Sequence, residues 1–265
     1  MYSKIAAVTV LFCVVPATAE ESVERLSGHR AVYELSFGSA RPNAGIVGAE
    51  GRYVFDLEDA CEGYALNERL VVRLARANDG ILTDYRLSAF ETSAGDSYRF
   101  STETAFDGQT GQAAEGSLTV GEKSAQVAYN TGDDLDFDEP VLTPVAHLRA
   151  VLDTARAGGE RHAATIFDGD RETPVFLAVT RITPVEDPQP VAAKGAEALD
   201  QMARWAIDSV YYQPQQNEGG EGSVPQFAFS AMLFENGIVD DLTLDYMDFS
   251  LKGQMSSLEL REPGC

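Results

Sequence analysis

The chain has 265 residues, of which 44% are hydrophobic and 23% charged, so it can form a substantial core and does not belong to the disordered class. Forty-two Asp and Glu residues against 20 Lys and Arg residues give a formal net charge of −22. This charge argues against nucleic acid or an anionic membrane surface as the main partner, because both attract cationic patches. Composition thus disfavours these partners and identifies no reaction.

The first residues have the pattern of a secretory signal peptide. Lys4 precedes an apolar run from Ile5 to Val15, and Ala17-Thr18-Ala19 supplies small residues after it. A short cationic segment, an apolar core of about 7–15 residues and a small-residue end describe such a leader. We predict cleavage after Ala19, which removes residues 1–19 and leaves one exported domain, residues 20–265. A buried N-terminal helix is the alternative interpretation.

Removal of the leader leaves two of the three cysteines, Cys61 and Cys265. Two cysteines allow one intramolecular pairing, and exported proteins meet an oxidising environment. We therefore predict a disulfide that ties the C-terminal end to the early part of the sheet. A buried free thiol at Cys61 and pairing between chains through Cys265 are the alternatives.

Alternation of apolar and polar residues predicts antiparallel strands in the first part of the chain. Turn residues such as Asn78-Asp79-Gly80 and Asp107-Gly108 separate the alternating segments. These segments are 31–37, 53–57, 70–74, 81–89 and 98–106. Strands and turns at this spacing predict a meander that closes, wholly or partly, around one core.

A helix is predicted over residues 144–157. Thr143 can cap it, Pro144 suits its first turn, and Gly158-Gly159 ends it. Its apolar residues lie on one face, which consists of Leu148, Val151, Leu152 and Ala155. We expect this face to cover one opening of the sheet.

Strand signals return after the helix and continue to the C-terminal region. The almost continuously apolar segment Val175–Thr180 is expected to be buried on both faces. Asn236-Gly237 predicts a hairpin turn, and a change in the apolar phase predicts a bulge or turn near Tyr246. The predicted strands of this half are 161–168, 174–183, 205–212, 227–233, 238–246 and 247–251. The segment 192–202 fits either a short helix or irregular chain.

Signatures of the common catalytic classes are absent from the sequence. It contains no Gly-x-Ser-x-Gly nucleophile elbow and no His-Glu-x-x-His zinc motif. Among the histidines only His147, on the predicted helix, is a candidate site residue, and a packed structural role is favoured over a general base. A hydrolase that uses His147 with a nearby acid remains as an alternative.

Two acidic segments are candidates for a cation site, and neither fits well. In the run Asp133–Glu139, alternate carboxylates suggest calcium, but Glu139 and Val145 occupy the positions where a calcium loop needs Gly and Glu. This run is interpreted as a solvated loop. Asp168, in Phe167-Asp168-Gly169-Asp170, belongs to a predicted hairpin turn and is kept as a possible structural or functional residue. We predict no metal and no cofactor.

A set of short motifs, taken in order, resembles the EipB family of alphaproteobacterial periplasmic envelope-integrity proteins. The resemblance covers essentially the whole chain after the leader. The motifs are His29-Arg30-Ala31-Val32-Tyr33, Asp59-Ala60-Cys61-Glu62-Gly63-Tyr64, Thr143-Pro144 with His147, Phe167-Asp168-Gly169, Glu235-Asn236-Gly237, Tyr246-Met247-Asp248-Phe249-Ser250-Leu251 and the cysteine at the C-terminal end.

The resemblance implies a mainly β fold: an antiparallel broken β-barrel, or β-spiral, with a disulfide between Cys61 and Cys265. It also implies a periplasmic, non-enzymatic protein that supports envelope integrity through a partner with tetratricopeptide repeats. Separately, we expect a monomer. A second possibility is a carrier, because an interior lined by Phe, Tyr, Leu and Val suits the acyl chain of a lipid or lipoprotein.

Overall fold

The computed structural model describes residues 25–213 and 225–264, so the predicted leader and Cys265 lie outside the described residues. The helical elements are α1 (Pro144–Arg156) and the 3-10 helix η1 (Glu197–Leu199). The strands are β1 (His29–Ala40), β2 (Ile46–Asp59), β3 (Gly63–Arg76), β4 (Gly80–Thr92), β5 (Ser97–Phe106), β6 (Gln109–Val120), β7 (Ala125–Tyr129), β8 (Leu135–Phe137), β9 (Arg161–Phe167), β10 (Val175–Pro184), β11 (Arg204–Tyr212), β12 (Pro225–Phe234), β13 (Val239–Asp245) and β14 (Phe249–Leu260). No described helix has the length and apolar character needed to cross a membrane.

All these strands form one antiparallel sheet of 14 strands, in the order β8-β7-β6-β5-β4-β3-β2-β1-β14-β13-β12-β11-β10-β9. The first and last strands of the chain meet in the middle of this sheet, where β1 pairs with β14. The end strands β8 and β9 are not paired with each other. The sheet is therefore an open spiral, which confirms the predicted mainly β fold of the broken-barrel type.

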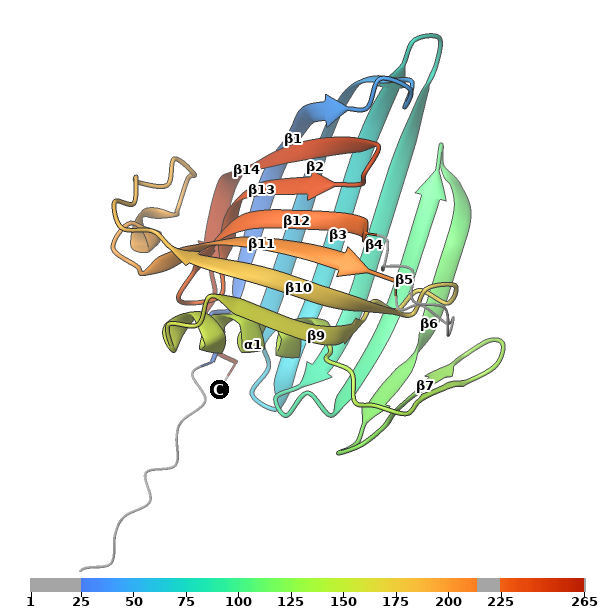
Figure 1. The fold of residues 1–265 in the computed structure, drawn as a ribbon, viewed down its shortest axis with the longest axis vertical. Helices are drawn as coiled ribbons and strands as arrows, with labels where there is room; N and C mark the ends of the chain where they lie inside the picture. Colours follow the sequence, from blue (N-terminus) through green and yellow to red (C-terminus); the bar gives the residue numbers. More distant parts are fainter. Residues whose placement is uncertain (1–24, 214–224, 265) are drawn as a thin grey trace, which may run out of the picture.

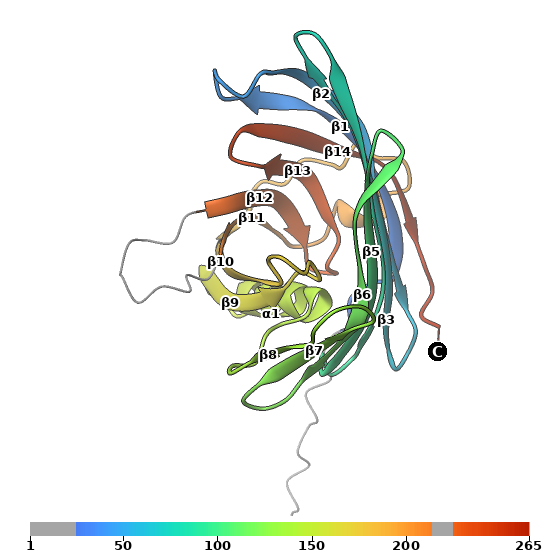
Figure 2. The ribbon, with the colours of Figure 1, turned by 90° about the vertical axis from the view of Figure 1, so that its right-hand side faces the viewer.

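The sheet curls so that its two halves face each other (Figure 1). Figure 2 shows β3, β5 and β6 as a tall wall, with β9 to β12 facing its concave side and α1 between them. The core lies in this space and draws on both halves, as Tyr98 and Leu118 on one side and Ile207 and Leu233 on the other show. Burial of their apolar surface is the main force that holds the curl.

Helix α1 begins and ends where the sequence predicts, but its N-terminal cap is different. Thr143 makes no capping hydrogen bond with its side chain. Instead the buried carboxylate of Glu91, from β4, accepts hydrogen bonds from the backbone N–H groups of Val145 (2.9 Å) and Ala146 (2.7 Å). At the other end Gly158 adopts the left-handed conformation (φ 75°), which glycine tolerates best.

The strand predictions hold for most of the chain and fail in three places. Strands β6 and β7 were not expected. The exposed first half of β6 has no apolar alternation, whereas β7 does alternate, with Ala125, Val127 and Tyr129 buried, but is only five residues long. The acidic run contains the short strand β8 in place of a pure loop. Val175–Thr180 alternates between buried and exposed residues, with Leu177 36% exposed, so the expectation that both faces are buried is wrong.

The segment that sequence patterns left open, 192–202, is ordered around one buried arginine. The guanidinium of Arg204 donates hydrogen bonds to the backbone oxygens of Leu199 (2.8 Å), Asp200 (2.9 Å) and Gln189 (3.0 Å). It also lies over the ring of Phe234, 4.6 Å from the ring centre. Several carbonyl groups without strand partners are satisfied by this single side chain.

Candidate functional site

A cavity of about 400 Å³ lies on the concave side of the tall wall. Strand register creates one side of it: Tyr85 of β4 stands opposite Thr104 of β5, which stands opposite Gln112 of β6. The loop between β9 and β10 forms the other side. The lining residues are Tyr85, Thr102, Thr104, Gly111, Gln112, Ala113, Ala114, Asp168, Asp170, Arg171 and Glu172.

The loop that carries the acidic side of the cavity is held by contacts to β7 and to the chain that follows it. The Tyr129 hydroxyl donates to the backbone oxygen of Asp170 (3.0 Å). The guanidinium of Arg171 lies over the Tyr129 ring, 5.0 Å from its centre, and donates to the backbone oxygen of Thr131. Asp170 accepts hydrogen bonds from two backbone N–H groups of its own turn. The carboxylate of Asp170 therefore has a defined position.

Two carboxyl groups at or near the cavity, those of Asp168 and Glu68, have raised pKa values and so hold their protons more tightly than in water. The side chain of Asp168 is open to the cavity, but the surrounding protein displaces much of the water around it. This desolvation raises the pKa of Asp168 to about 6, and the negative charge of Asp170 adds to the effect. Burial raises the pKa of Glu68, on β3, to about 7, against the opposing effect of a 2.7 Å hydrogen bond from the Tyr53 hydroxyl. A site with several carboxylates in poor solvation favours cationic or hydrogen-bond-donating groups.

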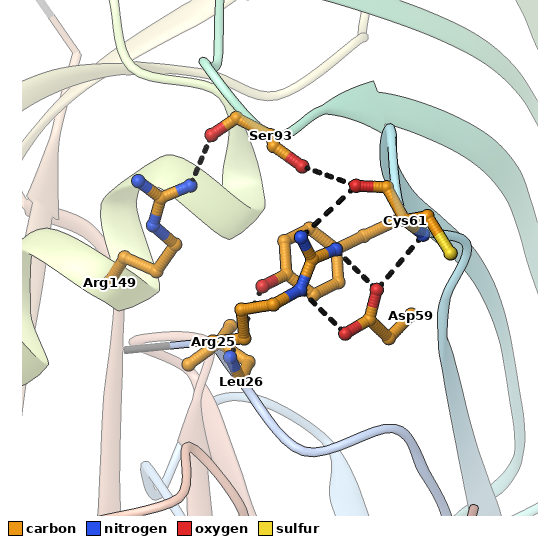
Figure 3. A network of polar contacts seen from close by, with 7 residues as sticks. Arg25, Leu26, Asp59, Cys61, Ser93 and Arg149 are labelled. Atoms are coloured by element: carbon orange, nitrogen blue, oxygen red, sulfur yellow. Dashed lines mark hydrogen bonds and ion pairs between the residues drawn. The ribbon is translucent and has the colours of Figure 1, made fainter. Parts of the chain in front are cut away.

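A second polar network connects the turn that contains Cys61 to helix α1 (Figure 3). The backbone oxygen of Cys61 accepts hydrogen bonds from Arg25 (3.0 Å) and from the Ser93 hydroxyl (3.3 Å). Arg149 of α1 in turn donates to the backbone oxygen of Ser93 (2.5 Å). Arg25 also forms an ion pair with Asp59, whose carboxylate accepts from the Cys61 N–H (3.0 Å). This network supports the position of α1 and contains no reactive arrangement.

The residues that the sequence singled out are separated in the structure. Asp168 lines the cavity. His147 lies on α1 and faces His162 of β9, with ring centres 5.8 Å apart. Burial, with a smaller contribution from His162, lowers the pKa of His147 to about 4, and no described carboxylate contributes to that shift. His147 therefore has the environment of a packed structural residue.

Cys61 lies in the tight turn between β2 and β3, in the left-handed conformation (φ 66°). Its predicted partner, Cys265, lies outside the described residues. The preceding residue, Gly264, donates its N–H to the backbone oxygen of Asp59 (2.8 Å), which brings the described end of the chain to this turn. The disulfide remains a prediction. Within the described segments, no group of three or more His, Cys, Asp or Glu side chains has the arrangement of a metal site.

Sequence patterns missed most of the cavity and both inward-facing glutamates. A signal for the glutamates does exist: Glu68 lies two residues from Leu66 and Leu70, and Glu91 lies two residues after Ala89, at inward positions of alternating strands. A carboxyl group in such a position needs a partner, because its burial alone is costly. Here the partners are Tyr53 for Glu68 and the helix N-terminus for Glu91.

Comparison with known proteins places the chain among proteins of the same fold. The family model described as EipB-like matches residues 20–262. The chain is 28% identical over 254 residues to the cell envelope integrity protein EipB of Brucella abortus (strain 2308), covering 94% of this chain and 89% of the relative. A crystal structure of a beta-barrel-like protein of a domain of unknown function from Brucella abortus superimposes with a TM-score of 0.80 at 26% identity, covering 90% of this chain and 99% of that one. The chain therefore belongs to the EipB-like family.

Proposed function

We propose that this protein is a non-enzymatic periplasmic factor that supports the integrity of the cell envelope by binding a protein partner. The observation that carries the proposal is the similarity to a cell envelope integrity protein along nearly the full length of both chains. The signal-peptide pattern of residues 1–19 supports export. The proposed partner class, a tetratricopeptide-repeat protein, follows from the family resemblance.

The geometry supports binding better than catalysis. His147 has a depressed pKa because it is buried, and none of its described contacts is a carboxylate that could orient it as a base. The cavity combines carboxylates, hydroxyls and an amide, but the arginine on its rim is already engaged by Thr131 and Tyr129. Such a surface recognises a ligand through charge and hydrogen bonds.

The carrier alternative gains less support from the cavity. An acyl chain requires an apolar lining, whereas this cavity is lined by Thr102, Thr104, Gln112 and the acidic loop. The large apolar side chains of the interior, such as Tyr98, Phe100 and Phe167, pack against one another. We therefore propose protein binding as the function and keep lipid carriage as the competing outcome of the test.

The test is complementation of a deletion strain of the source bacterium. We expect the deletion to increase sensitivity to detergent and to EDTA, and the wild-type gene to restore resistance. His147→Ala is expected to restore it as well, because the proposal gives His147 no chemical role. The protein must also be found in the periplasmic fraction, with its chain starting after Ala19.

Three results would contradict the proposal. A deletion strain with unchanged envelope resistance would remove the envelope role. Failure of His147→Ala to complement, although the variant is folded and exported, would favour the hydrolase alternative. Stoichiometric lipid in gently purified protein, detected by mass spectrometry, would favour the carrier.

A further inference from the structure

The two end strands of the open sheet are protected against pairing with another chain. Leu142 donates its N–H to the backbone oxygen of Thr165 (2.8 Å) and accepts from the N–H of Phe167 (2.9 Å), so the segment before α1 covers the edge of β9. Strand β8 has three residues and carries Asp136, with Asp134 and Asp138 on either side of it. Short, charged edges are a common defence against unwanted strand pairing.

The first half of β6 has neither kind of protection. Strand β7 pairs only with Gly116–Val120, and Figure 1 shows β7 beside the lower part of β6 alone. Within the described residues, 25–213 and 225–264, no strand pairs with Gln109–Ala114 on the side away from β5. This half-strand also contains no charged residue and no proline. The register with β5 shifts at Gly111, which leaves a bulge there, but from Gln112 to Ala114 the edge is regular and lacks the charges, proline or covering segment that usually block strand addition.

The hydrogen-bonding groups of this edge have a defined direction. Glu115 accepts a hydrogen bond at its backbone oxygen from the N–H of Asn130 (2.8 Å), on the side where β7 lies. Backbone groups of every second residue point to the same side of a strand, so the N–H and C=O of Ala113 point away from β5. Ala113 thus offers a donor and an acceptor to an incoming strand.

The cavity borders this free edge and carries negative charge. Gly111 to Ala114 line it on the β6 side, and Asp168, Asp170 and Glu172 line it on the opposite side. The guanidinium of Arg171 is engaged by the Thr131 carbonyl and the Tyr129 ring. A strand added to β6 would therefore place alternate side chains beside three carboxylates.

We propose that the free edge of β6 binds an extended, basic segment of a partner protein by strand addition, with cationic side chains of that segment in the acidic cavity. Main-chain hydrogen bonds to Ala113 give affinity, and the carboxylates of Asp168 and its neighbours select for lysine or arginine. This inference rests on the proposed function, because it assigns the docking surface and the chemistry of the protein partner.

The test uses synthetic peptides of about seven residues, a usual strand length. The probes are an alternating Lys–Val peptide, its Glu–Val counterpart, and the Lys–Val peptide with alternate backbone amides N-methylated. By fluorescence anisotropy, we expect the Lys–Val peptide to bind at least about tenfold more tightly than either other peptide. The N-methylated peptide keeps the charge, so it separates strand addition from attraction to the acidic protein. Hydrogen exchange at the Ala113 amide should slow when the Lys–Val peptide binds.

Variants of the protein give a second, matched test. Ala113→Pro removes the outward N–H but no hydrogen bond to β5, so it should weaken Lys–Val binding about tenfold while Ala113→Ser leaves it unchanged. Asp168→Asn should weaken binding of the Lys–Val peptide, but the N-methylated peptide should still bind this variant more weakly than the unmodified Lys–Val peptide does. This last variant keeps the test valid if Ala113→Pro does not fold.

Several results would overturn the inference: equal binding of the N-methylated peptide, an Ala113 amide already protected in the free protein, or no binding of the Lys–Val peptide. Competition by spermidine at the same affinity would assign the cavity to small cations and also exclude strand addition. These failures leave the complementation result untouched, so loss of the docking surface and loss of the proposed function are distinguishable.

Discussion

Glu68 and Tyr53 form an acid–phenol pair on the inner face of the wall, joined by a 2.7 Å hydrogen bond. The side chains two residues away on β3, Leu66 and Leu70, belong to the apolar interior. Burial raises the pKa of Glu68 to about 7, and the charge of Asp168 adds a smaller contribution in the same direction. The ionised form of Glu68 is therefore unfavourable in the folded protein, and the protonated form is not.

Substitution Glu68→Gln is expected to stabilise the protein at alkaline pH. The folded-state pKa, about 7, is above the unfolded value of 4.5, so ionised Glu68 destabilises the fold above pH 7 and this penalty disappears as the pH falls toward 4.5. The shift corresponds to at most about 3 kcal/mol, and partial exposure reduces it, so we expect a gain of about 1–2 kcal/mol at pH 8 and less than half of that at pH 5.

Urea denaturation at the two pH values measures this gain. Glu122→Gln, in the exposed turn after β6, is the matched control and should change neither value. A gain from Glu68→Gln that is the same at pH 5 and pH 8 would show that the carboxyl group has an ordinary pKa.

Helix α1 is held in place by hydrogen bonds to the strands and turns of the sheet. Glu91 binds its N-terminal N–H groups, and Arg149 and Arg156 bind the backbone oxygens of Ser93 and Glu235, both at 2.5 Å. The positive end of the helix dipole faces a carboxylate, which is the favourable direction. Burial raises the pKa of Glu91, while the helix N–H groups oppose that rise. The sequence of α1 thus accounts for its helical conformation, and its contacts with the sheet account for its place in the interior.

Substitution Glu91→Ala is expected to loosen α1 at its N-terminal end. It leaves the N–H groups of Val145 and Ala146 without their acceptor, at a cost of about 2–3 kcal/mol in unfolding free energy. Glu91→Gln, which retains one acceptor oxygen, should cost about 1 kcal/mol. Hydrogen exchange of the two amides measures the local effect, with Glu122→Ala as the control. Unchanged exchange at both amides would mean that another group caps the helix.

The whole molecule is a spiral whose first and last strands in the sequence are paired, whereas the two edge strands of the sheet are not. Strand β1 pairs with β14, and Gly264 reaches the turn that holds Cys61. The edge strands β8 and β9 remain separate, so the curled shape of the sheet depends on packing across the interior and on α1. A disulfide between this turn and the C-terminal end would stabilise the arrangement by restricting the unfolded chain.

Loss of the predicted disulfide is expected to lower the thermal stability. Cys61→Ser, Cys265→Ser or added reductant should each cost about 2–5 kcal/mol, or roughly 5–15 °C in melting temperature for a chain of this size. Thermal unfolding under oxidising and reducing conditions measures the effect. Reductant should cause no further change in Cys61→Ser, which is the internal control. The same melting temperature with and without reductant in the wild type would refute a structural disulfide.

Local patterns in the sequence were sufficient for most elements that bury one face; the five-residue strand β7 is an exception. Alternation identified β1 through Ala31, Tyr33 and Leu35, all buried, and helical spacing identified α1. The hairpin turn at Asn236-Gly237 and the turn after Asp245 follow from residues adjacent in the chain. In the strand and the helix, the contrast between a buried and an exposed face can be detected from neighbouring residues, because it repeats with the period of the element.

The curl, the cavity and the free edge were decided only in the folded chain. The first half of β6 is exposed and therefore has no alternation to detect. The cavity brings Tyr85, Gln112 and Asp168 together from three distant parts of the chain. Tyr33 pairs with Tyr53 on one side and with Met255 on the other, so the register of the sheet joins residues more than 200 positions apart. Such pairings depend on the packing of the whole sheet, for which no short stretch of sequence carries a signal.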